Sequence, residues 1–290
     1  MTKSVNDERI FNEDIGDSSY PMPIDTEEVY RLKLMHYAIK SAWKGNFSAP
    51  IKEALERGNA KILDIGCGSG VWIREMAALY PSSTFIGIDI SPTFQSDSSP
   101  TPSNASFQLC DIHNGLPFND NTFDYVHQSS LNGGISKTQW EPHIDQIVRI
   151  LKSGGYIELQ EGDVGVNNEN ENKDMHLIWE ALRGFLVDIN SFKVIIPQVK
   201  NFLESRKQLT NIEFNSQFID MAVSAGKPGE CARISYKIAL STLRFLLAPR
   251  MNISNEEYDA LVKSSFDFIE KYGGGYTCVR CFARKISSKL

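Results

Sequence analysis

Residues 61–73 read KILDIGCGSGVWI. A short apolar run carries an acid near its end, Asp64, and three glycines follow at alternate positions, Gly66, Gly68 and Gly70. A strand that runs into a glycine turn and then into a helix brings backbone N–H groups close to a ligand at the carboxyl edge of a parallel sheet. This stretch therefore predicts a ligand-binding loop.

The spacing of the glycines and the charge of Asp64 restrict the ligand. A dinucleotide loop of the pattern G-x-G-x-x-G would place its third glycine at position 71, which is Val71. A phosphate-binding P-loop would need a Gly-Lys-Ser/Thr sequence, which the stretch lacks. The carboxylate of Asp64 would repel a pyrophosphate but attract an ammonium group. These features favour S-adenosylmethionine (SAM).

The pattern along the chain predicts an α/β fold. From residue 61 onward, short apolar strands alternate with helical segments, which is typical of a parallel sheet covered by helices. An amphipathic helix is predicted before this region, from Thr26 to Lys44. Ser254 and Glu257 form a capping box at the start of a further predicted helix. Segments predicted after the core are helices near 175–188, 229–247 and 255–272 and a strand near 212–219.

Length and composition predict one catalytic domain. The chain has 290 residues and 41% hydrophobic content, which is enough to bury one large core. We expect residues 1–19, which are polar and acidic, to be a disordered tail, and residues 20–290 to be a single domain. Its expected parts are an N-terminal cap helix in 20–57, a ligand-binding core in 58–165, and a C-terminal part in 166–290 with a helical lid at about 229–272.

Charge and cysteine content restrict the partners and the compartment. The net charge of −6, without a run of Lys and Arg, argues against a nucleic-acid or anionic-membrane surface. The first 19 residues lack an apolar signal core, and no stretch approaches the roughly 18 apolar residues of a membrane helix. Five scattered cysteines indicate free thiols in a reducing compartment. We expect a cytoplasmic or nuclear protein with small-molecule or protein partners.

A pair of cysteines near the C-terminus raises the question of a metal site. Cys278 and Cys281 lie in a predicted strand, where residues three apart point to opposite faces. One such pair cannot chelate from both faces, and no second CxxC pair exists. We therefore expect no metal.

Several motifs together resemble the class I SAM-dependent methyltransferases. They are LDIGCGSG, GIDIS, CDIHNGLPFNDNTFDYV and LKSGGYIELQE, in which Ser153 stands where the family usually has proline. Gly154 and Gly155 keep the turn at that point. The resemblance implies a Rossmann-like sheet of seven strands that is mostly parallel, with an antiparallel last strand at Tyr276–Ala283.

The resemblance also implies how the cofactor would be held. Asp89 would bind the ribose hydroxyls, Asp111 would meet the adenine amino group, and Ile112 would pack on the ring. His127 and Gln128 end a strand beside the expected methionine tail, and strand alternation lets only one of them face the site. We expect a backbone contact to the cofactor there. Cys67 is expected to act only as a spacer in the loop. The cofactor-binding residues so predicted are Asp64, Gly66, Cys67, Gly68, Gly70, Asp89, Ile90, Asp111, Ile112 and Gln128.

A narrower resemblance is to the fungal methyltransferases grouped with the LaeA-like regulators of secondary metabolism. It rests on YPMPIDTEEVYRLKLMH, residues 20–36, and on a helical insertion before the last strand, and it covers nearly all of residues 20–285. It implies an enzyme of secondary metabolism. The alternative is a SAM-binding regulatory or scaffold protein with little turnover. An exposed apolar patch on the helices of 229–272 would favour the scaffold, and a closed pocket beneath them would favour the enzyme.

The chemistry of methyl transfer sets what the protein must supply. A sulfonium leaves as a neutral thioether, so no metal is required, and alignment of the reacting atoms at about 3 to 3.5 Å can do most of the work. We expect positioning of the acceptor to outweigh acid–base chemistry. The candidates for proton transfer are Glu161 and His127, and the candidates for substrate contact are His36, Trp140, Glu161 and Asp163.

Simpler interpretations stand beside these candidates. His36 and Trp140 fit buried core positions equally well, Arg31 fits a solvated face as well as a carboxylate clamp, and acids in a rim loop are usually solvated. The segment HQSSLN lacks the N/D-P-P-Y/F pattern associated with adenine and glutamine amide methylation. We therefore expect a small hydroxylated or amine metabolite as the methyl acceptor.

Overall fold

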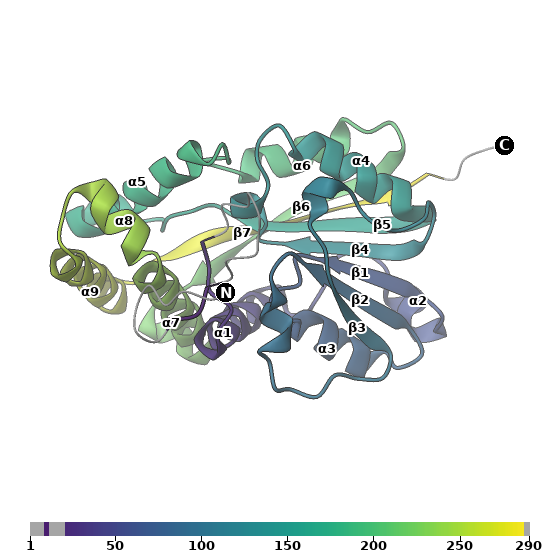
Figure 1. Ribbon diagram of the computed structural model, residues 1–290, viewed down its shortest axis with the longest axis horizontal. Coiled ribbons are helices and arrows are strands. Elements are labelled where there is room, and N and C mark those ends of the chain that lie inside the picture. Colours follow the sequence, from purple (N-terminus) through teal and green to yellow (C-terminus); the bar gives the residue numbers. More distant parts are fainter. Residues whose placement is uncertain (1–8, 12–20, 287–290) are drawn as a thin grey trace.

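The computed structural model describes residues 9–11 and 21–286 and shows one seven-stranded sheet flanked by helices (Figure 1). The strand order is β3-β2-β1-β4-β5-β7-β6. The strands are β1 Lys61–Ile65, β2 Thr84–Asp89, β3 Ala105–Leu109, β4 Phe123–Ser129, β5 Leu151–Gly162, β6 Leu209–Asp220 and β7 Gly275–Lys285.

The direction of the strands confirms the predicted fold class. β1 pairs in parallel with both β2 and β4. The pairs β2–β3 and β4–β5 are parallel as well. β7 runs antiparallel between β5 and β6, which confirms the predicted antiparallel last strand. Gly154, at φ 82°, lies in an irregular part of β5, where the register to β4 shifts. The glycine turn expected at that point is therefore built into the start of the strand.

Helices cover both faces of the sheet because its central strands are apolar on both sides. Ile62, Leu63 and Ile65 of β1 are fully buried. α4 and α6 pack on one face in one core, and α2 and α3 pack on the other face in a second core. The helices are α1 Thr26–Trp43, α2 Lys52–Arg57, α3 Val71–Leu79, α4 Trp140–Ile150, α5 Lys173–Asp188, α6 Ile196–Glu204, α7 Gly226–Thr242, α8 Arg244–Met251 and α9 Asn255–Tyr272.

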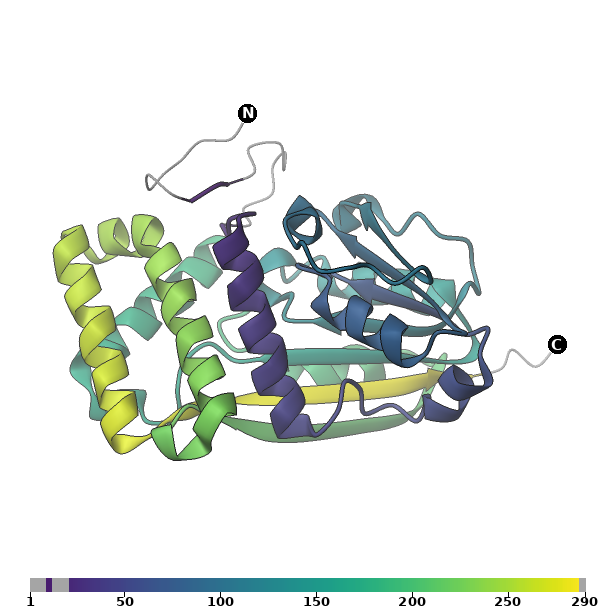
Figure 2. The ribbon, with the colours of Figure 1, turned by 90° about the horizontal axis from the view of Figure 1, so that it is seen from below.

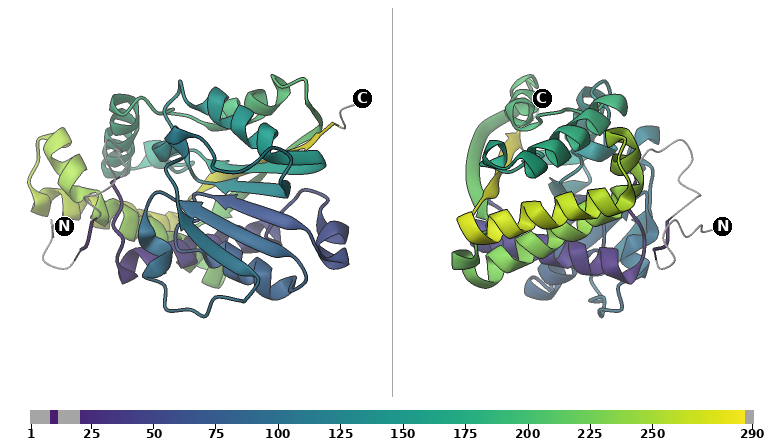
Figure 3. Two further views of the ribbon diagram at one scale, coloured as in Figure 1. Left: turned by 45° about the vertical axis from the view of Figure 1, so that its right-hand side comes forward. Right: turned by 90° about the vertical axis from the view of Figure 1, so that its left-hand side faces the viewer.

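The segment between β6 and β7 forms the predicted helical insertion, as α7, α8 and α9. These helices gather with α5 and α1 at one end of the molecule, and α1 lies along α7 (Figures 2 and 3). They share a third core, in which Tyr258, Val262, Phe266 and Ile269 of α9 are buried. The insertion is therefore packed into the fold through a shared core. Its role as a lid over the substrate stays a prediction.

The N-terminal segment also differs in part from expectation. Arg9 donates from Nε to Asp25 Oδ2 at 2.7 Å and from Nη1 to Thr242 Oγ1 at 2.8 Å. Phe11 packs edge-on against Phe245 at 5.4 Å. The expectation of a disordered tail over 1–19 is thus wrong for residues 9–11, and the rest of that range lies outside the described residues.

The start of α1 is capped by Asp25. Asp25 accepts a hydrogen bond from the Glu28 N–H at 2.9 Å. The Glu28 carboxylate turns away from the cap and pairs with the Arg31 guanidinium at 2.6 Å. α1 therefore begins with a single cap, while Glu28 and Arg31 form a buried ion pair.

The start of α9 provides a test of local stability. Ser254 Oγ accepts from the Glu257 N–H, and Glu257 Oε2 accepts from the Ser254 N–H, which confirms the predicted capping box. We expect Ser254→Ala to lower the free energy of unfolding by about 1 kcal/mol, as loss of an N-cap typically does. Ser264→Ala, inside the same helix, is the control and should cost nothing, because alanine favours helix. Equal urea-unfolding curves for both variants would contradict the assignment of the cap.

Candidate functional site

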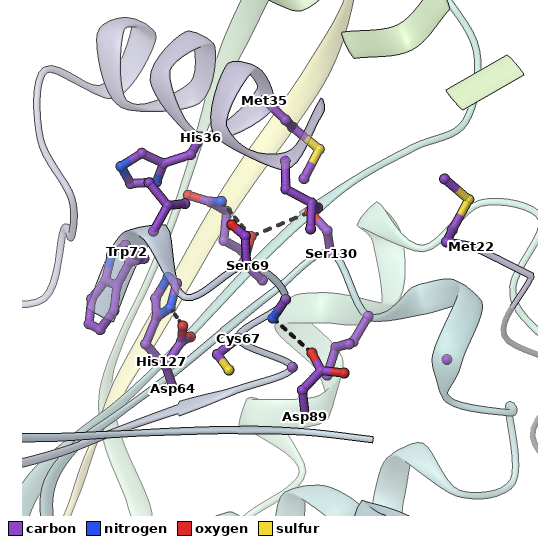
Figure 4. A pocket seen from close by; sticks show the side chains of 18 of the residues that line it. Met22, Met35, His36, Asp64, Cys67, Ser69, Trp72, Asp89, His127 and Ser130 are labelled. Atoms are coloured by element: carbon purple, nitrogen blue, oxygen red, sulfur yellow. Dashed lines mark hydrogen bonds and ion pairs between the residues drawn. The ribbon is translucent and has the colours of Figure 1, made fainter. Parts of the chain in front are cut away.

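A cavity of about 330 Å³ lies at the carboxyl ends of β1, β2 and β4, beneath α1. We call it the glycine-loop cavity (Figure 4). The predicted cofactor residues that line it are Asp64, Gly66, Cys67, Gly68, Asp89, Ile90, Asp111 and Ile112. His36 and His127 line it as well. Residues from five separate stretches of sequence therefore meet at one site.

The glycine loop is fixed by backbone hydrogen bonds to the neighbouring strand. The N–H groups of Gly66 and Cys67 both donate to the Ile88 carbonyl, at 2.8 and 3.0 Å. Gly68, at φ 54°, occupies the left-handed region that favours glycine, and its N–H donates to Asp89 Oδ2 at 2.8 Å. The loop therefore follows the end of β2 closely before α3 begins.

Asp89 ends β2 at the floor of this cavity. Its other carboxylate oxygen accepts from the Ser91 N–H at 2.8 Å. Burial raises the pKa of Asp89 to about 6, although the N–H groups of Ser91 and Gly68 oppose the shift. The carboxylate is thus held in place by two backbone donors and is mostly ionised at neutral pH.

Asp64 and His127 form a buried pair behind the loop. Asp64 Oδ1 lies 2.7 Å from His127 Nδ1, because these residues are directly opposite on the paired strands β1 and β4. The Trp72 ring stacks on His127 at 4.3 Å with an interplanar angle of 4°. The structure gives no partner among the described residues to the buried His127 Nε2, Ser69 Oγ and Asn46 Oδ1, and all three side chains line the cavity.

α1 supplies the cover of the cavity. His36 Nε2 contacts Glu75 Oε2 of α3 at 2.7 Å, and Lys40 contacts the other oxygen of Glu75. The hydrogen bond from His36 lowers the pKa of Glu75 to about 2, and burial opposes that shift. His36 is therefore at the cavity, as the sequence suggested, but one of its ring nitrogens is engaged with α3.

Asp111 and Ile112 form a side wall between β3 and β4. Asp111 accepts from the His113 N–H at 2.9 Å and from Asn114 Nδ2 at 2.9 Å, which holds the short turn at Ile112–Asn114. Ile112 and Cys110 also line the cavity. The acidic side chain of Asp111 and the apolar side chain of Ile112 thus lie together in this wall.

A second cavity, of about 250 Å³, adjoins the first. We call it the aromatic cavity because Trp179, Tyr236 and Tyr276 line it. Arg31, Met35, Ile39, Ser130 and Ala239 line both cavities. Glu161 and Asp163 belong to the second cavity.

The two acids of the aromatic cavity have different surroundings. Glu161 is only 1% exposed and accepts from the Leu131 N–H at 2.8 Å. Asp163 Oδ1 accepts from the N–H groups of Ile195 and Ile196, at 2.7 and 3.1 Å. Glu161 is thus a buried group of β5, where the sequence suggested a solvated rim acid, and Asp163 anchors the start of α6.

Three of the residues predicted from sequence, Gly70, Gln128 and Trp140, do not line either cavity. The side chain of Gln128 points to the other face of β4 and lies 2.6 Å from His143 Nε2 of α4. Trp140 is fully buried and stacks on Phe202 at 4.9 Å, in the core between the sheet and α6. The side chain of Gln128 is therefore directed away from the cofactor site, and the backbone contact expected there stays a prediction. A substrate contact by Trp140 is wrong, because its side chain is buried in the core. Strand alternation brings His127 to the site, and its neighbour packs behind the sheet.

Several lining residues were not singled out from the sequence. Ser69 and Ser130 sit in loops, and Trp179 and Tyr236 come from helices far apart in the chain. Ser69 lies within the glycine loop that the sequence singled out. Trp179 and Tyr236 join the site only through the packing of α5 and α7, so no local pattern marks them. The apolar stripe of α1 was a further signal, and it contributes Ile39 to both cavities.

The described residues contain no cluster of three or more His, Cys, Asp or Glu side chains that could hold a metal ion. Cys278 and Cys281 belong to different cores, as expected for opposite faces of β7. Over the part of the chain that the structure describes, no helix has the length and apolar character needed to cross a membrane.

Comparison with known proteins places the fold and the motifs in a known group. Residues 62–155 match the model of a family described as "Methyltransferase domain". The chain is 31% identical, over 53% of its residues, to the "Secondary metabolism regulator laeA" of Coprinopsis cinerea, of which it covers 38%. It is 23% identical to the "N-methyltransferase gliN" of Aspergillus fumigatus, over 89% of this chain and 94% of that protein.

Solved structures support the fold alone. The YcgJ protein of Bacillus subtilis has a TM-score of 0.50 at 17% identity, over 82% of this chain and 97% of that chain. The chain spans about half or less of the length of the first curated relatives that it matches. Residues 62–155 are therefore similar to a methyltransferase domain, and about half of the chain is similar to proteins named as a LaeA regulator and as fungal methyltransferases.

Proposed function

We propose that the protein is a SAM-dependent methyltransferase and that SAM binds in the glycine-loop cavity. The observation that carries this proposal is the Asp89 carboxylate, held at the end of β2 by the Gly68 N–H at 2.8 Å. A carboxylate fixed beside a glycine loop is suited to accept hydrogen bonds from two neighbouring hydroxyl groups, as a ribose presents.

The unpartnered polar atoms of the cavity fit the rest of the cofactor. His127 Nδ1 faces the Asp64 carboxylate, so the other ring nitrogen, Nε2, is left for a ligand. With the proton on Nδ1, Nε2 accepts a hydrogen bond, as an α-ammonium group would give. The adenine would lie at the other end, between Asp89 and the wall of Asp111 and Ile112.

The residues of the site bind and orient and do little chemistry of their own. When bound, SAM supplies a methyl group on a sulfonium that departs as a neutral thioether, so an aligned acceptor is the main requirement. Asp64 holds the His127 ring in one orientation, and Trp72 holds its plane. α1 covers the cavity and excludes water from it.

We further propose that the acceptor is a small molecule of secondary metabolism. The support is the likeness to fungal relatives, which include the "N-methyltransferase sirN" of Leptosphaeria maculans. A scaffold role is the alternative, since the laeA relative is named a regulator. The aromatic cavity lies beneath α7, where Tyr236 and Leu240 line it, and a cavity there favours an enzyme.

The first test is the dependence of SAM binding on Asp89. We expect Asp89→Ala to weaken the binding of SAM and of S-adenosylhomocysteine (SAH) by roughly 1 to 3 kcal/mol, the usual cost of losing hydrogen bonds to a charged acceptor. Asp124→Ala is the control, because Asp124 lies at the amino end of β4 and binds the Lys61 N–H and Lys152. Calorimetric titration that finds no binding by the wild type, or equal affinity in both variants, would refute the assignment.

The raised pKa of Asp89 predicts a pH dependence in the same titration. With a pKa of about 6 in the free protein, the carboxylate becomes protonated below pH 6 and stops accepting from hydroxyl groups. SAM affinity should therefore fall toward lower pH, by up to about tenfold per pH unit below 6. Asp89→Asn should bind weakly and lack this part of the dependence. A wild-type affinity for SAM that is constant from pH 7.5 to pH 5 would contradict the role of the Asp89 carboxylate.

A second test uses the conformation of the glycine loop. Gly68 has φ 54°, and an added Cβ would lie 3.0 Å from Leu32 Cδ1, another residue of the cavity wall. We expect Gly68→Ala to lower SAM affinity at least roughly tenfold, through backbone strain at the binding surface. Gly226→Ala is the matched control, because Gly226 has φ 63° and no atom within 4 Å of its added Cβ. Normal SAM affinity in Gly68→Ala would show that the loop has another role.

A further inference from the structure

The aromatic cavity is placed to receive a second molecule beside the first. It shares a boundary with the glycine-loop cavity along Arg31, Met35 and Ile39 of α1, Ser130 and Ala239. Glu161 lies at this boundary, because its carboxylate accepts from the N–H of Leu131, which lines the glycine-loop cavity. A molecule in one cavity can therefore touch a molecule in the other.

The walls of the aromatic cavity suit an apolar ring. Trp179 of α5 packs edge-on against Tyr236 of α7 at 5.7 Å, and Tyr236 packs on Tyr276 of β7 at 4.7 Å. Leu182 and Leu240 complete these walls. Aromatic and aliphatic side chains on three sides favour a flat apolar body over a charged or strongly hydrated one.

A few polar atoms in these walls have no partner within the described part of the chain. They are Nε1 of Trp179, which is 2% exposed, and Oδ1 of Asn132, which is 7% exposed. Asn132 Nδ2 donates to the Phe192 carbonyl at 2.7 Å, which leaves Oδ1 as the acceptor that lacks a donor. Buried polar atoms of this kind normally have a partner, so these two indicate a ligand with both an acceptor and a donor.

Glu161 is a buried carboxyl group that lines the aromatic cavity together with Trp179 and Asn132. Burial raises its pKa to about 8, while the Leu131 and Asn132 N–H groups oppose the rise and Asp163 adds to it. At pH 7 the empty site would thus hold mostly the protonated acid. The other titratable or charged groups that line the cavity are Arg31 of α1, which is paired with Glu28, Tyr236 of α7, and Tyr276 and Cys278 of β7.

We propose that the aromatic cavity binds the methyl acceptor and that Glu161 takes up the proton that the acceptor loses. The acceptor class is a neutral, ring-sized molecule that presents an N–H or O–H group to Glu161 and a carbonyl or ether oxygen to Trp179. The inference rests on the proposed function, because it needs SAM in the glycine-loop cavity.

The step balances in atoms and charge. The bond from the acceptor nitrogen or oxygen to the methyl carbon forms as the carbon–sulfur bond of the sulfonium breaks. The N–H or O–H proton passes to the Glu161 carboxylate. One cation and one carboxylate become a neutral thioether and a neutral acid, so no further reactant is needed. The sulfonium charge also favours ionisation of Glu161 before the step.

The sequence named Glu161 as a candidate for proton transfer, but it led us to expect that positioning of the acceptor matters more. A solvated acid in a rim loop would leave positioning as the main effect. A carboxyl group that is 1% exposed and lies at the boundary of two cavities is instead suited to proton transfer.

Proton release on SAM binding tests the role of Glu161 without a known substrate. SAM or SAH is titrated into the full chain at pH 7 by calorimetry, in two buffers of different ionisation enthalpy. We expect SAM to release roughly half a proton or more beyond what SAH releases, because only SAM carries the sulfonium charge. Glu161→Gln should abolish this difference, and Asp124→Asn, which changes an acid at the amino end of β4 away from both cavities, should retain it. Equal release by SAM and SAH from the wild type would overturn the proton-accepting role.

Binding of an aromatic lactam tests the cavity itself. Quinolin-2(1H)-one, which carries an N–H and a carbonyl on one edge, should bind the protein–SAH complex with a Kd below about 1 mM. Leu182→Trp and Leu240→Phe narrow the cavity and should weaken this binding at least tenfold with SAH affinity unchanged. Val187→Trp, on the exposed side of the same helix as Leu182, is the control.

The outcomes separate this inference from the proposed function. Failure of quinolin-2(1H)-one to bind the SAH complex would overturn the acceptor class. Binding that neither Leu182→Trp nor Leu240→Phe weakens would overturn the location. Failure of the wild type to bind either SAM or SAH would refute the proposed function itself.

Discussion

The hydrogen bond from the Gly68 N–H to the Asp89 carboxylate is the contact on which the rest of the site depends. It joins the loop after β1 to the end of β2, and the N–H groups of Gly66 and Cys67 reinforce that join by donating to the Ile88 carbonyl. The loop is thereby kept low against the sheet. The space above it, beneath α1, becomes the glycine-loop cavity.

Parallel pairing of β1 with β4 supplies the other half of the site. The register places Asp64 opposite His127, so a carboxylate and an imidazole from distant parts of the sequence meet in a buried position. Trp72, from the helix that follows the loop, stacks on the imidazole. Asp64 of β1 and Trp72 of α3 thus set the orientation of the His127 ring, whose Nε2 atom faces the cavity.

The helical end of the molecule has its own core and shapes the second cavity. α5, α7, α8 and α9 pack together with α1, and Trp179 of α5 and Tyr236 of α7 line the aromatic cavity. This core is separate from the two cores that flank the sheet. Changes in α5 or α7 can therefore alter what the second cavity accepts while the glycine loop stays in place.

The sequence predicted the parts of the fold that local patterns specify. The glycine loop, the alternation of strands and helices and the capping box at Ser254 could be predicted, because each depends on residues close together in the chain. The antiparallel direction of the last strand was implied only by the resemblance to the class I methyltransferases. The positions of the Gln128 and Trp140 side chains could not be predicted from local patterns, because they depend on which face of the sheet α4 and α6 cover. The burial of Glu161 follows from its contact with Leu131, 30 residues away, and no local pattern records it.

A crystal structure of the protein with bound SAH tests the central claim most directly. The account predicts that the ribose hydroxyls contact Asp89, that the adenine lies against Ile112, and that the amino acid part lies beside His127. The sulfur atom should then face Ser130, at the boundary with the aromatic cavity. Density for SAH elsewhere, or a ribose that does not contact Asp89, would contradict the account.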